Sequence, residues 1–173
     1  MINSVIIDDE PKNLKILVRL IEEFCPEVNI AGTAERIDVA IELIRTKKPE
    51  LVFLDIAMPG GTAFDLLDRL QPVDFEVIFV TAHDSYTFTA FKYSAVDYLL
   101  KPVTIEELQS AVTRAIERKK QKQNNLLQLG NLLNSINKQQ ASSIRKIAVP
   151  TSDGLIFLDV SEIIRCEASG AYT

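Results

Sequence analysis

Five short apolar runs, separated by longer amphipathic stretches, constrain the fold of this chain more than any other feature of its sequence. The runs occupy residues 5–7, 28–31, 51–54, 77–80 and 98–100. Most are rich in Val, Ile and Phe and lack polar alternation, which is typical of strands buried on both faces. Between them apolar residues recur at helical spacing, as at Leu14, Leu17 and Ile21. Strands that alternate with helices predict an α/β fold with a parallel, doubly wound, five-stranded sheet.

After the fifth run, apolar residues recur in a single heptad register. This pattern is much longer than a helix needs to be in order to cover a sheet of this size. Thr104 and Glu107 form a capping-box pattern at its start. One interpretation is that residues 105–115 pack on the sheet and the remainder is a solvated linker. The other is an extended helix that pairs with a second copy of itself. The residues of this expected dimerisation helix are Leu126, Leu129, Leu133 and Ile136.

Charge is distributed unevenly along the 173 residues, although the net charge is only −5. Residues 1–113 hold 10 Lys/Arg against 19 Asp/Glu, residues 114–146 hold 8 against 1, and residues 147–173 hold 1 against 4. Such blocks suggest an acidic domain, a basic connector and the beginning of another part. We expect a domain over residues 1–120 and, over residues 121–145, a helical linker with the pattern of a coiled coil.

Residues 146–173 change to strand and turn signals. Apolar runs at 147–149 and 155–158 flank a turn of Thr, Ser, Asp and Gly, which predicts a β-hairpin. Residues 163–166 are a candidate third strand. These 28 residues are fewer than the roughly 40 that an unaided fold usually needs. We therefore expect the fragment of a second, β-rich domain here.

The remaining bulk features point to a cytoplasmic protein without a membrane span. No apolar run approaches the roughly 18 residues of a membrane helix, and no secretory signal is visible at the N-terminus. Cys25 and Cys166 are the two cysteines, which is too few for a disulfide-built secreted scaffold.

Polar residues follow four of the five apolar runs directly. Asp8 and Asp9 follow the first, Asp55 the third, Thr81 the fourth and Lys101 the fifth. Because the carboxyl ends of parallel strands meet at one edge, we expect these side chains to converge. Clustered carboxylates repel unless a cation offsets them, and oxygen ligands of this kind suit Mg²⁺. Since Asp55 is ionised at neutral pH, the arrangement fits phosphoryl transfer onto that aspartate.

Four motifs in order resemble the signature of response-regulator receiver domains: Ile6-Ile7-Asp8-Asp9-Glu10, Asp55-Ile56-Ala57-Met58-Pro59-Gly60, Thr81-Ala82 and Lys101-Pro102. The resemblance covers residues 1 to about 120 and implies a flavodoxin-like strand order. One departure is Ala63, where many members of the family have glycine.

The resemblance also implies a role for each matching position. Asp55 would be the phosphoacceptor that receives a phosphoryl group from a partner histidine kinase. Mg²⁺ would be held by the carboxylates of the site and by one backbone carbonyl. The implied metal ligands are Asp8, Asp9, Asp55 and the carbonyl of Ala57. Lys101 would be the lysine that pairs with the phosphate, and its peptide bond to Pro102 would be cis. Thr81 would be the switch hydroxyl. Tyr98 would be the aromatic residue whose inward or outward position follows that of Thr81.

Residues 90–102 narrow the resemblance to receivers that precede a LytTR-type DNA-binding domain, and residues 146–173 resemble the opening strands of that domain. This implies a two-component response regulator that controls transcription, with DNA bound through the full-length output domain rather than through this fragment. A homodimer is the expected assembly. Such a switch is not an enzyme, since its phosphoryl-transfer chemistry is directed only at itself.

Two alternatives come from other classes of protein. A Mg²⁺-dependent aspartyl-phosphate phosphatase of the haloacid-dehalogenase type would require Asp-x-Asp after the first strand, where this chain has Asp8-Asp9-Glu10. A stand-alone dimerisation module would leave the acidic residues without a function, although each expected polar position is filled.

Overall fold

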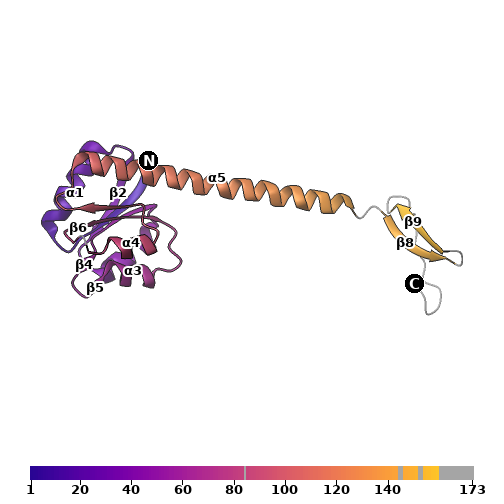
Figure 1. The fold of residues 1–173 in the computed structure, drawn as a ribbon, viewed down its shortest axis with the longest axis horizontal. Coiled ribbons are helices and arrows are strands. Elements are labelled where there is room, and N and C mark those ends of the chain that lie inside the picture. Colours follow the sequence, from indigo (N-terminus) through magenta and orange to yellow (C-terminus); the bar gives the residue numbers. More distant parts are fainter. Residues whose placement is uncertain (84, 144–145, 152–153, 160–173) are drawn as a thin grey trace. The chain divides into compact units, whose positions relative to one another are not determined.

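The computed structural model describes residues 1–83, 85–143, 146–151 and 154–159. The chain divides into two compact units, Met1–Lys122 and Gln123–Thr173. The first unit contains a sheet flanked by helices, and the second contains the continuation of a long helix and a hairpin (Figure 1).

A five-stranded parallel sheet forms the centre of the first unit. Its strand order is β2-β1-β3-β6-β7, which is the flavodoxin-like order. In the central register Ile6 lies opposite Phe53, and Phe53 lies opposite Ile78. The predicted α/β fold class is therefore confirmed, because each apolar run lies in a strand. The strands are β1 Ile2–Ile7, β2 Val28–Ala34, β3 Leu51–Leu54, β6 Glu76–Thr81 and β7 Asp97–Leu100.

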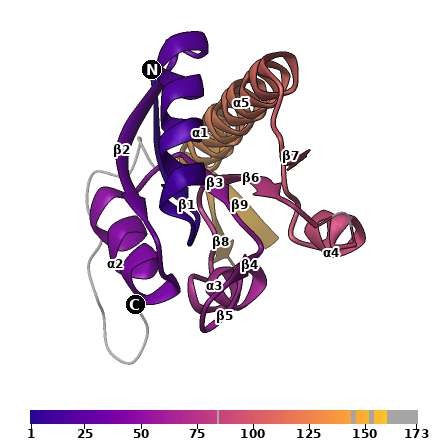
Figure 2. The same ribbon diagram turned by 90° about the vertical axis from the view of Figure 1, so that its left-hand side faces the viewer.

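Helices cover both faces of this sheet (Figure 2). They are α1 Pro11–Phe24, α2 Ile37–Lys47, α3 Ala63–Arg69, α4 Thr87–Lys92 and α5 Ile105–Ser143. Helices α1 and α5 pack on the face that carries Phe53, and α2, α3 and α4 pack on the face that carries Leu54. Because successive strand residues point to opposite faces, an unbroken apolar run supplies both cores at once.

Local sequence signals set where the helices begin. Pro11 occupies the first turn of α1, where its missing N–H is not needed. Thr104 caps α5: its hydroxyl accepts a hydrogen bond from the Glu107 N–H at 3.3 Å and donates to the Glu107 carboxylate at 2.9 Å. The capping box predicted at the start of the long helix is present.

A short hairpin that the apolar pattern did not predict follows β3. It consists of β4 Ala57–Met58 and β5 Gly61–Thr62. Gly61 has a φ of +152°, and a Cβ there would lie 3.0 Å from Asp65 Oδ2. The peptide bond between Lys101 and Pro102 is cis, as the resemblance implied.

In the second unit α5 continues to Ser143, and a two-stranded antiparallel hairpin follows. Its strands are β8 Lys146–Thr151 and β9 Gly154–Asp159, where the sequence predicts a hairpin. The candidate strand at 163–166 lies outside the described residues, as do the side chains of the expected dimerisation residues. The division at 120 and 145 stays a prediction. No helix in the described part of the chain is long and apolar enough to cross a membrane.

Candidate functional site

Three carboxylates and one ammonium group meet at the carboxyl edge of the sheet. Asp8 follows β1, Asp55 follows β3 and Lys101 follows β7. The Lys101 Nζ lies 2.6 Å from Asp8 Oδ2 and 2.5 Å from Asp55 Oδ2. Asp9 contributes a further carboxylate oxygen, which lies within 4.8 Å of one from Asp8 and one from Asp55. The structure thus brings together residues that are 93 positions apart in the sequence.

Backbone hydrogen bonds between neighbouring strands fix these side chains in register. The Asp55 N–H donates to the Ile7 carbonyl at 2.9 Å, and the Lys101 N–H donates to the Thr81 carbonyl at 2.9 Å. The site residues therefore lie at the last hydrogen bonds between neighbouring strands. The parallel register of the strands determines which of their side chains meet.

Asp8 is the most buried carboxylate of the site, with 2% of its surface exposed. Burial raises the pKa of its carboxyl group, although hydrogen bonds from Lys101 and from the Glu10 N–H work in the opposite direction. Its Oδ1 accepts from the Glu10 N–H at 3.0 Å and from Asn13 Nδ2 at 3.5 Å. Sequence reasoning missed Asn13, which also donates to Glu10 Oε2 at 2.6 Å. The available signal was the position of Asn13, in the first turn of the helix that follows the acidic pair.

Lys101 carries the compensating charge. Burial alone would lower the pKa of its ammonium group, but hydrogen bonds to Asp55 and Asp8 outweigh that effect and hold the pKa above its usual value. The lysine is therefore protonated at neutral pH and can pair with a second anion brought next to Asp55.

The donor set fits a hard divalent cation. Asp8, Asp9 and Asp55 each offer a carboxylate oxygen within 4.8 Å of the other two. Mg²⁺ prefers such oxygen ligands and retains several of its waters. Burial is the largest cause of the raised pKa of Asp8, and a bound cation would favour the ionised form of this carboxyl group. The site is thus an acidic pocket compatible with Mg²⁺.

Thr81 and Tyr98 meet at the backbone of His83 rather than at Asp55. The fully buried Thr81 accepts a hydrogen bond from the His83 N–H at 3.4 Å, and the Tyr98 hydroxyl donates to the His83 carbonyl. The Tyr98 ring lies 6.3 Å from that of Phe79. Among the described residues, the Thr81 hydroxyl makes no hydrogen bond to Asp55. Ala57 lies in β4, two residues after Asp55, and the role of its carbonyl stays a prediction.

A pocket of about 320 Å³ lies beside the acidic residues. Asp8 and Lys101 line it together with apolar side chains that include Ile16, Leu20 and Val103. Ile16 is 49% exposed, although it belongs to a helix whose other apolar side chains are largely buried. The site therefore combines a charged centre with an adjoining apolar surface.

Comparison with known proteins identifies the class to which this fold and site belong. The response regulator receiver domain family matches residues 5–113, so the chain belongs to that family. The family favours the receiver interpretation over the phosphatase and the stand-alone dimerisation module.

Individual relatives give the extent of the similarity. An uncharacterized response regulatory protein of Vibrio vulnificus is 41% identical over 115 residues, which are 66% of this chain and 47% of that protein. The sensory transduction protein LytT of Bacillus subtilis is 31% identical over 166 residues, 95% of this chain and 64% of LytT. The chain spans about half the length of several of the curated relatives it matches.

Among solved structures, a DNA-binding response regulator of the LuxR family from Staphylococcus aureus superposes with a TM-score of 0.60 and 28% identity. The superposition covers 66% of this chain and 98% of that chain. The fold and the family are therefore supported both by sequence and by structure.

Proposed function

We propose that this chain is the phosphoacceptor switch of a two-component system, and that Asp55 accepts a phosphoryl group from a sensor histidine kinase. The observation that carries the proposal is the Lys101 ammonium group, 2.5 Å from Asp55 Oδ2 and 2.6 Å from Asp8 Oδ2. A carboxylate that shares a cation with a second acid is placed to receive phosphorus next to positive charge.

In the proposed reaction a carboxylate oxygen of Asp55 attacks the phosphorus of a phosphohistidine. The new O–P bond forms as the P–N bond breaks, and the departing histidine keeps that electron pair and takes a proton from solvent. Lys101 stays protonated and shifts its contact from the Asp55 carboxylate to an oxygen of the transferred group. The reaction modifies the chain itself, so we regard the protein as a signal transducer rather than an enzyme with a separate substrate.

Asp8, Asp9 and Asp55, with the backbone carbonyl of Ala57, are the groups that we propose to hold Mg²⁺. When bound, the ion would neutralise charge on the phosphoryl oxygens. Asp8 supports this assignment because its burial leaves a carboxylate that gains from an added cation. Asn13 and the Glu10 N–H fix one oxygen of Asp8, which leaves the other directed at Lys101.

The kinase is proposed to dock over the apolar surface beside the site. Ile16, Leu20 and Val103 line the pocket that Asp8 and Lys101 share. A contiguous exposed apolar surface rimmed by polar groups is typical of a site that a protein partner covers.

Switching is proposed to run from Thr81 to Tyr98 and then to a change of self-association. Both side chains make a hydrogen bond to the backbone of His83. A movement of Thr81 towards a phosphoryl group would therefore change the contact between His83 and Tyr98. A modification shifts such an equilibrium only as far as it prefers one state. We propose further that the chain acts as a homodimeric transcription regulator, and that residues 146–173 belong to a LytTR-type DNA-binding domain. The likeness to the sensory transduction protein LytT over 95% of the chain supports the assignment to LytT-type regulators.

The test is incubation of the chain with a small-molecule phosphodonor, acetyl phosphate, in the presence and absence of Mg²⁺. We expect a labelled acyl phosphate to form from labelled acetyl phosphate when Mg²⁺ is present, and not to form when a chelator is added. Asp55→Ala should abolish it, whereas Asp74→Ala, at an exposed aspartate that precedes the amino end of β6, should leave it unchanged. Label that persists in Asp55→Ala would contradict the assignment.

A further inference from the structure

The basic stretch of α5 that leaves the sheet is held by acids on the receiver. Lys122 Nζ lies 2.5 Å from Glu76 Oε1, and Arg118 Nε lies 3.3 Å from Glu76 Oε2. Lys119 pairs with Glu50 and Arg114 pairs with Asp97. The sequence alone does not reveal these contacts, because the acids are far away along the chain.

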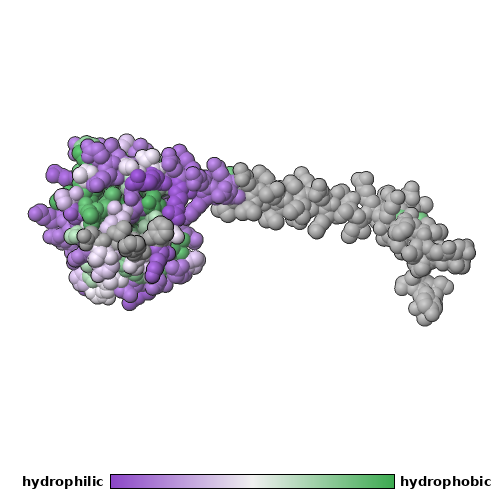
Figure 3. Space-filling model, viewed as in Figure 1, coloured by the Kyte–Doolittle hydropathy of each residue, from purple (hydrophilic) through white to green (hydrophobic). Residues whose placement is uncertain are grey.

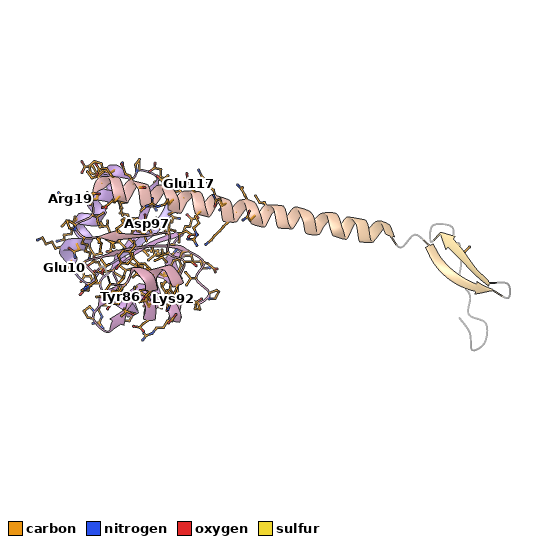
Figure 4. The ribbon with its side chains drawn as sticks, in the orientation of Figure 1. Glu10, Arg19, Tyr86, Lys92, Asp97 and Glu117 are labelled. Carbon is orange, nitrogen blue, oxygen red and sulfur yellow. The ribbon has the colours of Figure 1, made fainter. Side chains whose placement is uncertain are left out.

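The acids share one position in the fold. Glu76 and Asp97 are the first residues of β6 and β7, and Glu50 directly precedes β3. At their carboxyl ends, β6 ends at Thr81, β7 directly precedes Lys101 and β3 directly precedes Asp55. Three of the four strands that lead to a site residue therefore also carry, at the amino end, an acid that contacts α5. Figure 4 labels Asp97, which lies below α5 in that view, and Glu117, which belongs to the helix itself.

Glu76 is the centre of this arrangement because it is buried, with only 5% of its side chain exposed. A buried carboxylate is costly unless it is paired, and here two cations from successive turns of α5 reach it. Glu50 is held on its other side, where its Oε2 accepts from the Asn3 N–H at 3.0 Å. Arg118 also donates to the Ala95 carbonyl at 3.4 Å.

Apolar packing ends before these contacts do. Ala115 is the last fully buried residue of α5 among the described residues, and Ile116 is partly buried against the same core. Beyond Ile116 the coloured surface of the helix in Figure 3 is mostly hydrophilic (purple), and the exposed Leu127 is an apolar exception. Lys119 and Lys122 occupy heptad positions that apolar residues hold earlier in the helix. The boundary between the two compact units falls directly after Lys122.

We propose that Glu50, Glu76 and Asp97 form an acidic clasp that holds residues 114–122 of α5 on the receiver and so fixes the turn at which the helix passes out of it. The lysines in the heptad register are then explained by contact with this clasp. A seam for pairing with a second copy would begin only after Lys122. The clasp belongs to the folded receiver and does not depend on phosphoryl transfer to Asp55, so the two proposals can fail separately.

Hydrogen exchange of the full chain, measured on peptides that cover residues 116–122, tests the clasp. A helix segment without tertiary contacts is marginal in water and exchanges rapidly. We expect Glu76→Gln to accelerate exchange in these residues about tenfold, since two ion pairs to a buried carboxylate are lost. Glu42→Gln, at an exposed glutamate of α2, is the matched control and should change nothing.

A second experiment exchanges the charges of Lys119 and Glu50. It is needed because Glu76→Gln could also destabilise β6. Lys119→Glu places like charges opposite each other and should accelerate exchange in residues 116–122. Adding Glu50→Lys to that variant should restore most of the protection. The clasp is overturned if Glu76→Gln leaves residues 116–122 as protected as Glu42→Gln does, if the acceleration spreads equally over the whole sheet, or if the exchanged pair fails to recover protection.

Discussion

At the scale of single residues, Lys101 determines how much negative charge the sheet edge can hold. Its ammonium group contacts Asp8 and Asp55, both of which are buried. Removing one partner of a buried pair leaves an uncompensated charge, and that loss is larger than the net stabilisation by the pair itself. Stability and chemistry are therefore linked at this residue.

Lys101→Met should lower the free energy of unfolding by about 3 kcal/mol in the presence of a chelator. Mg²⁺ should recover part of this loss, because a bound cation takes over the neutralisation of the carboxylates. Urea unfolding with and without Mg²⁺ measures both effects. Lys92→Met, at an exposed lysine of α4, is the control. A loss no larger than that of the control would contradict the account.

The ion pair between Glu50 and Lys119 predicts that the stability of the fold depends on pH. The hydrogen bond from Lys119 holds the pKa of its carboxyl group below the ordinary value of 4.5. The carboxylate therefore stabilises the fold above that value, and its contribution is lost as the pH falls through the lowered pKa. Because the side chain is 36% exposed, the contribution is only about 0.5 kcal/mol.

Urea unfolding of the wild type and of Glu50→Gln, compared at about pH 6 and about pH 3.5, measures this contribution. At the higher pH the wild type should be more stable than Glu50→Gln. The difference in free energy of unfolding between the two proteins should be smaller at the lower pH. A difference that grows on acidification would show that the sign is wrong.

At the scale of elements, the hairpin after Asp55 depends on the cap of α3. The Thr62 hydroxyl accepts from the Asp65 N–H at 3.3 Å, and Asp65 Oδ2 accepts from the Thr62 N–H at 2.7 Å. The same residue ends β5 and caps the helix, so that the loop containing Ala57 and the start of α3 form one structure.

Thr62→Ala should therefore cost about 1 kcal/mol of stability, which is typical of a lost N-cap. Thr62→Ser keeps the hydroxyl and should retain most of that stability. Thermal unfolding of the two variants makes the comparison. Equal losses in both would indicate that the methyl group, rather than the cap, is what matters.

The elements also show how far the sequence could predict this fold. The run at 51–54 is apolar throughout, so its burial on both faces followed from the pattern. Its central place in the sheet followed from the flavodoxin-like strand order that the resemblance implied. The convergence of Asp8, Asp55 and Lys101 followed in turn, because parallel strands end at one edge. The β4–β5 hairpin was missed since two-residue strands have no periodicity to detect.

The contacts of Glu76 were missed for a different reason. A single acid at the start of a buried strand and a basic stretch 42 residues later have no local pattern that links them. Only the path of α5 across the sheet brings Arg118 and Lys122 to it. Asn13 was missed because its contact with Asp8 depends on how α1 begins rather than on a strand end.

At the scale of the whole molecule, the long helix and the proposed dimer belong together. Helix α5 is continuous from Ile105 to Ser143. Its expected dimerisation residues Leu126 and Leu133 lie beyond the last contact that the described residues of α5 make with the receiver, at Lys122. Helices of this length are stable in water mainly where an apolar face is covered.

Replacing Leu126 and Leu133 together with asparagine should shift the full chain from dimer to monomer in sedimentation velocity. The two substitutions replace half of the four apolar side chains expected to hold this short seam together. Replacing the exposed Gln121 and Gln123 with asparagine is the matched control. An unaltered dimer would assign association to the receiver instead.

The most direct test of the central claim is to locate the phosphoryl group. After incubation with acetyl phosphate and Mg²⁺, intact mass spectrometry should show a single added phosphoryl group, and peptide mapping should place it on Asp55. Asp55→Asn should remain unmodified under the same conditions. Modification of another residue in the wild type, or of Asp55→Asn to the same extent, would contradict the account.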